Sequence, residues 1–303
     1  MRSLSLITCA FLAIACGAPV AENPHDDTRA TVETGYAEFG QSRIYYEIKG
    51  EGPPLVLIHG GLLNCHMWDG QFDVFAERYR VLRYDASSHG NSATPPDAYY
   101  DHEDLDSLLS ELGIGRAVIM GLSFGGRVAI DYALEHPENV AAVVAVGPGL
   151  GGFRFDSEEV AAGRQESIEA WGNQDWDRVV ELFQRSWTDG PHRSPDEIDP
   201  EVREQVRAMT RKTMERAAAG QVTEGRTMDP PAISRLDELE MPMLVVLGEL
   251  DMPDIHEIGE LLLDANPNAE KVVIGGVAHM VNLEKPAEFN RVVLEYLEEL
   301  PLS

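Results

Sequence analysis

The sequence predicts an α/β fold, in which a mostly parallel sheet of eight strands carries helices on both faces and a helical cap is inserted after the sixth strand. Three observations lead to this prediction. Short apolar runs without polar alternation recur along the chain, as is typical of parallel strands covered on both faces. Segments with the spacing of amphipathic helices separate these runs. The alternation stops between residues 150 and 236, where only helical patterns occur, and then resumes.

The first half of the chain supplies most of the sheet. Residues 33–49 alternate polar and apolar side chains around Gly40-Gln41-Ser42, which predicts an antiparallel hairpin. The apolar runs that follow predict strands at residues 54–58, 80–84, 116–120 and 140–146. The helical patterns between them predict helices at residues 67–79, 101–112 and 125–136.

The second half begins with the insertion and ends with the remaining strands. Helical segments are predicted at residues 158–171, 176–186 and 200–219. Strands return at residues 243–248 and 271–274, and each is followed by a helical pattern, at residues 254–263 and 286–297. We therefore expect a core made of residues 35–149 and 237–303, with residues 150–236 as a helical cap.

The N-terminus is typical of an exported protein. Residues 1–15 contain Arg2 and then an apolar stretch that is shorter than the roughly 20 residues of a membrane-spanning helix, which indicates a secretory signal. The stretch ends at Cys16-Gly17 and resembles the lipobox of bacterial lipoproteins, although Ala13 stands where Leu is usual. That resemblance implies a lipid on Cys16, a flexible tether over residues 16–34, and an anchored protein facing the periplasm or cell exterior. Ordinary cleavage and release as a soluble secreted or periplasmic protein is the alternative.

Charge and cysteine content exclude several classes of partner. The 303 residues include 52 acidic and 24 basic side chains, a net charge of −28, which disfavours binding to nucleic acid or to anionic membrane surfaces. We therefore expect membrane association only through the lipid anchor. With Cys9 removed and Cys16 lipidated, Cys65 has no partner for a disulfide. The sequence has no Cys/His cluster with zinc spacing and no glycine-rich phosphate loop, so we expect neither a metal nor a cofactor.

A candidate nucleophile lies at Ser123. The predicted strand before it ends in Gly121-Leu122-Ser123-Phe124-Gly125, a G-x-S-x-G pattern, and a helical pattern follows. Glycines allow strand and helix to approach closely at such a turn, which lifts the serine hydroxyl above the sheet edge. A glycine-rich turn with a serine N-cap would share the short pattern, so a base, an acid and an oxyanion site are needed as well.

Candidates for these groups follow other strand ends. Asp251 comes just after residues 243–248, and His279 follows residues 271–274, so both fall at the strand edge where Ser123 lies. A serine hydroxyl needs an imidazole to remove its proton, and the imidazole needs a carboxylate to hold its tautomer. Glu249 and Asp254 are the competing carboxylates beside Asp251. Backbone N–H groups of Gly61 and Phe124 are predicted to face the developing oxyanion.

These residues and their order resemble the α/β-hydrolase superfamily over nearly all of residues 33–303. The nearest resemblance is to the esterase, enol-lactonase and non-haem haloperoxidase-like branch. One departure is Ser88, where that branch usually has glycine before His-Gly, and it puts the local turn geometry in question. The matching segments are His59-Gly60-Gly61, residues 85–92, Gly121–Gly126, Gly248–Asp251, and Ala278-His279 with Glu284-Lys285-Pro286.

The resemblance implies a serine hydrolase that cleaves a small-molecule carboxylic ester or lactone through an acyl-enzyme on Ser123, His279 and Asp251. The alternatives are a carbon–carbon bond hydrolase or a perhydrolase on the same triad, and a non-catalytic binding lipoprotein, although such a scaffold should have lost a triad member. His59 is interpreted as a structural turn residue and Glu284 as a brace for the His279 loop. Which cap tryptophan contacts substrate stays open among Trp171, Trp176 and Trp187.

Overall fold

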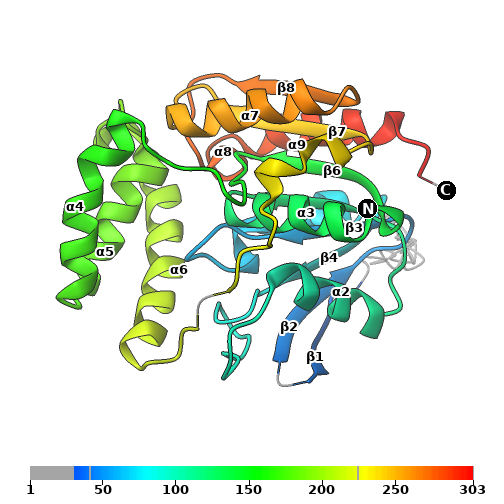
Figure 1. Ribbon diagram of the computed structural model, residues 1–303, viewed down its shortest axis with the longest axis horizontal. Helices are drawn as coiled ribbons and strands as arrows, with labels where there is room; N and C mark the ends of the chain where they lie inside the picture. Colours follow the sequence, from blue (N-terminus) through cyan, green and yellow to red (C-terminus); the bar gives the residue numbers. More distant parts are fainter. Residues whose placement is uncertain (1–30, 41, 224, 303) are drawn as a thin grey trace, which may run out of the picture.

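The computed structural model describes residues 31–40, 42–223 and 225–302 (Figure 1). Their strands form one sheet in the order β1-β2-β4-β3-β5-β6-β7-β8. The pairs β1–β2 and β2–β4 are antiparallel, and the pairs from β4–β3 to β7–β8 are parallel. The fold class predicted from the sequence is confirmed. The strand bounds are β1 (Glu33–Phe39), β2 (Ser42–Lys49), β3 (Pro54–Ile58), β4 (Arg80–Tyr84), β5 (Ala117–Leu122), β6 (Val140–Val146), β7 (Met243–Gly248) and β8 (Ala269–Ile274).

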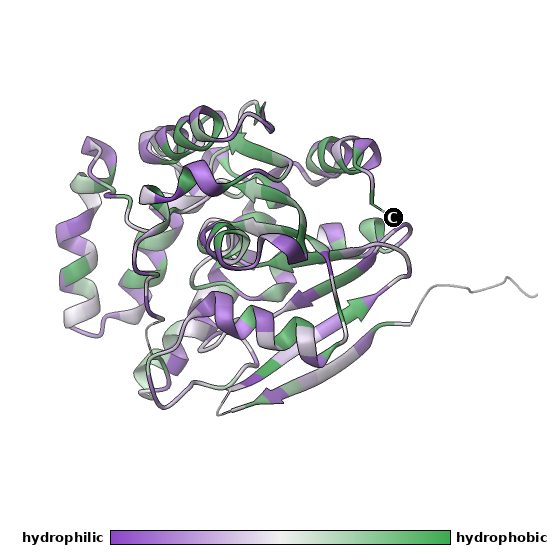
Figure 2. Ribbon diagram, turned by 45° about the vertical axis from the view of Figure 1, so that its right-hand side comes forward, coloured by the Kyte–Doolittle hydropathy of each residue, from purple (hydrophilic) through white to green (hydrophobic). Residues whose placement is uncertain are grey.

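Helices cover both faces of this sheet because alternate side chains of the central strands are apolar on each face. Val56 and Ile58 of β3 belong to the core beneath α2, α3 and α7, whereas Leu55 and Leu57 pack on the side of α1 and α9. Figure 2 shows the hydrophobic residues concentrated in the central strands. The helix bounds are α1 (Asp69–Phe75), α2 (Asp101–Glu111), α3 (Phe124–Glu135), α7 (Pro253–Ala265), α8 (Val281–Glu284) and α9 (Pro286–Glu299).

The insertion between β6 and β7 is helical and lies at one end of the molecule (Figure 1). It contains α4 (Glu158–Gly172), α5 (Trp176–Phe183) and α6 (Pro200–Ala218), and a π-helical segment, Gln184–Asp189, continues directly from α5. Val206 and Met209 of α6 join the core on the α1 and α9 side, so the cap is packed against the sheet domain.

Three details differ from the sequence-based expectation. The helix predicted at residues 67–79 consists of a 3-10 turn, Cys65–Trp68, and the short α1, because the Asn64 side chain accepts the His66 N–H and starts the turn earlier. The expected tether, residues 16–34, overlaps β1, whose pairing with β2 begins at Glu33. Helix α8 was not expected, because four residues are too few for a helical period.

The expected signal segment and Cys16 lie outside the described residues. Among the residues that the structure describes, no helix has the length and apolar character needed to cross a membrane.

Candidate active site

Ser123 occupies a strained turn between β5 and α3. Its backbone has φ 56° and ψ −111°, in the half of conformational space that residues other than glycine seldom adopt. Neighbouring segments of the chain hold it there. Its N–H donates to Val146 O at 2.9 Å, and its carbonyl accepts from Arg127 N at 3.0 Å and Gly149 N at 2.9 Å. The turn therefore keeps its conformation without a ligand.

The glycines around Ser123 are required by close backbone approach. A Cβ on Gly121 would lie 2.1 Å from Gly125 O, and a Cβ on Gly125 would lie 2.2 Å from Ile58 O. Both distances are well inside van der Waals contact, so any larger residue would force β5, α3 and β3 apart. The G-x-S-x-G spacing is thus explained by the packing of the turn.

The structure brings Asp251 and His279 together from two different loops. Asp251 Oδ2 lies 2.7 Å from His279 Nδ1, and both side chains are buried. The other carboxylate oxygen accepts the Met252 N–H at 2.7 Å, so the carboxylate is held in position. A carboxylate accepts a hydrogen bond from the protonated Nδ1, which leaves His279 Nε2 as the basic nitrogen. Nε2 is buried and has no hydrogen-bond partner among the described residues.

The loops meet because Gly248 has no side chain. A Cβ on Gly248 would lie only 1.9 Å from Ala278 O, so the segment before His279 passes directly over the end of β7. Gly147 makes a similar close approach, since a Cβ there would lie 3.0 Å from His279 Nδ1. The sequence motif included Gly248, whereas nothing in the sequence pattern indicated Gly147.

Ser123 and His279 line the same cavity, of about 270 Å³. Apart from these two residues its walls are apolar side chains and the backbone of the loop after β3. Trp187, from the π-helical segment of the cap, forms part of one wall. The other lining residues are Gly60, Gly61, Leu62, Leu63, Leu122, Phe183 and Met280.

The two predicted oxyanion residues are neighbours. A Cβ on Gly61 would lie 3.6 Å from Phe124 Cβ, and Phe124 is the first residue of α3, whose N-terminal end is favourable for negative charge. Within the described part of the chain, neither the Gly61 N–H nor the Phe124 N–H donates to another residue. Gly61 lines the Ser123 cavity, whereas the Phe124 ring turns away and packs on His59 and His89.

The structure separates Asp251 from the two competing carboxylates. Glu249 Oε2 accepts the Gly276 N–H at 2.7 Å and thereby shapes the turn after β8. Asp254 Oδ1 accepts the N–H groups of Asp156 at 2.7 Å and Ser157 at 3.2 Å, at the entry to the cap. Among the three, the hydrogen bond to His279 is made by Asp251.

The loop that carries His279 is braced by a buried ion pair. Glu284 Oε1 accepts the Ala278 N–H at 3.1 Å, as expected, and Arg193 of the cap donates to both oxygens of Glu284 at 2.6 and 3.0 Å. Arg193 also donates to Thr188 O at 3.0 Å and Asp189 O at 2.8 Å. Arg193 therefore ties the π-helical segment of the cap to the His279 loop. No sequence pattern indicated it, because the two partners are 91 positions apart.

His59 has the structural role expected of it. Ala86 N–H donates to His59 Nε2 at 3.0 Å, so the ring proton is on Nδ1 and donates to Gly60 O at 2.8 Å. Burial lowers the pKa of His59 to about 4, and the neighbouring His89 acts in the same direction. His59 thus connects the loops after β3 and β4 in its neutral form.

Ser88, the departure from the family pattern, adopts the left-handed conformation that glycine tolerates better, with φ 67°. Its hydroxyl donates to Thr223 O and accepts the Thr223 N–H, both at 3.2 Å. The serine therefore fastens the chain where it returns from the cap, an interaction that glycine could not make.

One cap tryptophan reaches the candidate site. The Trp187 ring centroid lies 4.7 Å from that of His279, with the planes inclined by 47°. Trp171 and Trp176 instead pack edge to face on each other, with ring centroids 5.4 Å apart. The three tryptophans are distinguished by their position relative to His279, which sequence spacing does not reveal.

A possible metal-binding group among the described residues consists of Glu47, Cys65 and His66, whose ligand atoms lie within 4.8 Å of one another. It fits a metal poorly. Glu47 already accepts from Arg83 Nε at 2.8 Å and Tyr45 OH at 2.6 Å, so a guanidinium stands beside the carboxylate. Burial raises the pKa of the Cys65 thiol, which opposes the thiolate that a metal requires.

Known proteins resemble this chain over most of its length. A model of the alpha/beta hydrolase family matches residues 55–292. A pimeloyl-[acyl-carrier protein] methyl ester esterase of Aeromonas hydrophila is 26% identical over 82% of this chain and 96% of its own length. A 2-hydroxy-6-oxononadienedioate/2-hydroxy-6-oxononatrienedioate hydrolase of Burkholderia vietnamiensis is 28% identical over 90% of this chain and 97% of its own.

A solved structure described as Est816, an N-acyl homoserine lactone degrading enzyme, is also similar. It superimposes with a TM-score of 0.68 at 28% identity, covering 86% of this chain and 99% of that one. The family model spans well over half of the 303 residues, including Ser123, Asp251 and His279. The chain belongs to the alpha/beta hydrolase family, and it is a hydrolase by that membership.

Proposed function

We propose that this hydrolase cleaves a carboxylic ester or lactone through an acyl-enzyme formed on Ser123. The observation that carries the proposal is the Asp251–His279 hydrogen bond of 2.7 Å, which leaves Nε2 unpartnered at the cavity that Ser123 also lines. In this mechanism Nε2 removes the Ser123 proton as Oγ attacks the substrate carbonyl, and Asp251 stabilises the imidazolium. The imidazolium then protonates the leaving alkoxide, and water hydrolyses the acyl-enzyme by the same proton transfers.

The carbonyl oxygen becomes negatively charged when Oγ adds to the carbon. In the proposed mechanism the N–H groups of Gly61 and Phe124 bind this oxyanion. Their proximity and the N-terminal end of α3 support this role. Because the strained turn at Ser123 is held by its own backbone bonds, these donors need little reorganisation during the reaction.

Neutral esters and lactones fit the cavity better than dicarboxylates, which the name of the Burkholderia vietnamiensis relative indicates for that protein. No Lys or Arg is among the described residues that line the Ser123 cavity. Arg127, one turn after Ser123, is already paired with Asp101 at 2.6 Å and Asp131 at 3.0 Å. The net charge of −28 also repels anionic substrates. Carbon–carbon bond hydrolysis of a neutral diketone is the second candidate on the same residues.

Ser123→Ala tests the proposal. We expect the variant to keep its fold by circular dichroism and to lose about 10⁴-fold or more of its p-nitrophenyl acetate turnover. A fluorophosphonate probe should label the wild type at Ser123 and leave the variant unlabelled. Near-normal ester hydrolysis by Ser123→Ala would exclude the acyl-enzyme mechanism.

A further inference from the structure

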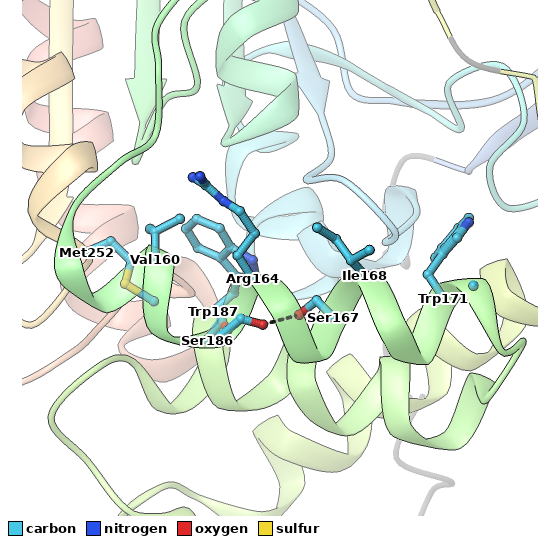
Figure 3. A pocket seen from close by; sticks show the side chains of 10 residues that line it. Val160, Arg164, Ser167, Ile168, Trp171, Ser186, Trp187 and Met252 are labelled. Carbon is cyan, nitrogen blue, oxygen red and sulfur yellow. Dashed lines mark hydrogen bonds between the residues drawn. The ribbon is translucent and has the colours of Figure 1, made fainter.

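A second, larger cavity lies between α4 and the π-helical segment of the cap. Its volume is about 550 Å³, roughly the size range of small-molecule sites in proteins. Figure 3 shows Val160, Ile168 and Trp171 projecting from one side of α4. Trp187 and Met252, from the cap and from the segment before α7, complete a mainly apolar lining. Its polar members are Arg164, Ser167 and Ser186, and the Arg164 guanidinium donates to Phe155 O.

Among the residues that the structure describes, few pack against this apolar side of α4. Ala170 is the one buried residue among the 15 residues of the helix. Ile168 is 59% exposed and Trp171 is 45% exposed, although both are large apolar side chains. Exposed apolar groups gathered at a concave surface are typical of a binding site. The helix is nevertheless held in position, since Asp254 accepts the N–H groups of the two residues that precede it.

The larger cavity borders the candidate active site on the side of His279, the proposed general base. Trp187 lines both cavities, and its ring packs against His279 at 4.7 Å. Met252 lines the larger cavity and directly follows Asp251, to which its N–H donates. The Trp187 indole therefore borders both cavities beside the Asp251–His279 pair.

This position assigns the cavity to one part of an ester. In the proposed mechanism His279 protonates the alkoxide oxygen as the carbon–oxygen bond breaks, so the alcohol part of the substrate must lie on the His279 side. The acyl group stays bonded to Ser123 Oγ in the 270 Å³ cavity, which is about half as large.

We propose that the cavity under α4 binds the apolar alcohol part of the substrate, and that the preferred substrates are esters of small acids with larger apolar alcohols. The inference rests on the proposed function. The proton that Ser123 loses is carried by His279 to the alkoxide, which leaves as the free alcohol, so the step needs no further reactant.

Two ester series test the inference. One varies the alcohol at constant acyl group (ethyl, butyl and octyl acetate), and the other varies the acyl group at constant alcohol (ethyl acetate, butyrate and octanoate). For the wild type we expect kcat/KM to rise at least tenfold from ethyl to octyl acetate. Along the acyl series kcat/KM should stay constant or fall towards octanoate, because the Ser123 cavity is small.

A substitution on α4 then tests the cavity itself. Ser167→Phe fills it from one wall, and we expect it to remove the rise in kcat/KM along the alcohol series. Ala162→Phe is the matched control, since Ala162 is exposed on α4 and does not line the cavity. It should behave like the wild type on both series.

Several results would overturn the inference. A preference for octanoate that Ser167→Phe abolishes would assign the cavity to the acyl group instead. Equal rates along both series, unchanged in Ser167→Phe, would show that the cavity binds no part of the ester. Activity on p-nitrophenyl acetate separates these results from a failure of the proposed function, which would abolish ester hydrolysis altogether.

Discussion

The Thr213 hydroxyl, on cap helix α6, donates a hydrogen bond of 3.0 Å to the carbonyl of Leu62, in the loop that carries Gly61. Leu62 has φ 61°, a conformation that is unfavourable for a leucine and needs outside support. The cap therefore helps to hold the loop from which the Gly61 N–H would bind the oxyanion.

We expect Thr213→Val to lower kcat for p-nitrophenyl acetate by roughly 3- to 10-fold with little change in KM. Loss of one hydrogen bond costs about 1 kcal/mol, and 1.4 kcal/mol corresponds to tenfold in rate. Thr213→Ser, which keeps the hydroxyl, should restore kcat. A lower melting temperature of Thr213→Val with unchanged kcat would show that the bond supports the fold alone.

Asp251→Asn should reduce turnover by roughly 10²- to 10⁴-fold, because an asparagine favours the wrong imidazole tautomer. Glu249→Gln and Asp254→Asn should each cost less than about tenfold, since these carboxylates accept backbone N–H groups elsewhere. Steady-state kinetics on one soluble ester compares the three. A severe loss in a neighbouring variant together with a silent Asp251→Asn would mean that the acid is misassigned.

The Ser88 position separates backbone strain from hydrogen bonding. Ser88→Ala loses the bonds to Thr223 and keeps the strained φ, whereas Ser88→Gly loses the bonds and relieves the strain. We expect Ser88→Gly to be more stable than Ser88→Ala by about 1 kcal/mol in urea unfolding. Equal stabilities would argue that the left-handed conformation at this position carries no penalty.

His59 should make the protein less stable in mild acid. Its pKa falls from 6.5 in the unfolded chain to about 4 in the fold, because burial disfavours the charged ring. In this pH range the unfolded state binds more protons than the folded state. The contribution of His59 to the free energy of unfolding is therefore complete above pH 6.5 and is lost as the pH falls towards 4. Between pH 7 and pH 4.5 the loss amounts to about 2–3 kcal/mol.

The measurement compares urea unfolding of wild type and His59→Gln at those two pH values. Between these pH values the stability of His59→Gln should fall by about 2–3 kcal/mol less than that of the wild type. The comparison between variants matters because burial raises the pKa of Asp131 to about 6, which has the opposite effect over this range. Identical losses in wild type and His59→Gln would contradict the assignment.

We also propose that Cys16 carries a lipid and anchors the protein, as the lipobox-like sequence indicates. Cys16→Ser should move the protein from the membrane fraction to the soluble fraction, with unchanged activity on soluble esters. Mass spectrometry of the wild-type N-terminal peptide is the direct check, and a peptide without an acyl chain would favour simple secretion.

Much of the fold could be predicted because its signals are local. The strand at residues 80–84 and the strand at residues 140–146 coincide with β4 and β6, since a buried parallel strand is a continuous apolar run. The G-x-S-x-G turn was recognisable for the same reason: its glycines lie two positions before and two positions after the serine whose turn they permit. Helix α8, with four residues, offered no period to detect.

The α/β class, the helical insertion, and the positions of Ser123, Asp251 and His279 just after strand ends could all be predicted from the amino-acid sequence. The folded structure was needed to show that Asp251 rather than Glu249 bonds His279, that Trp187 packs against His279, and that Arg193 and Thr213 tie the cap to the loops of the site. The difference lies in the sequence separation of the interacting residues. Strands and turns follow from neighbouring residues, whereas the last two contacts join residues 91 and 151 positions apart, whose meeting depends on how the whole cap packs on the sheet.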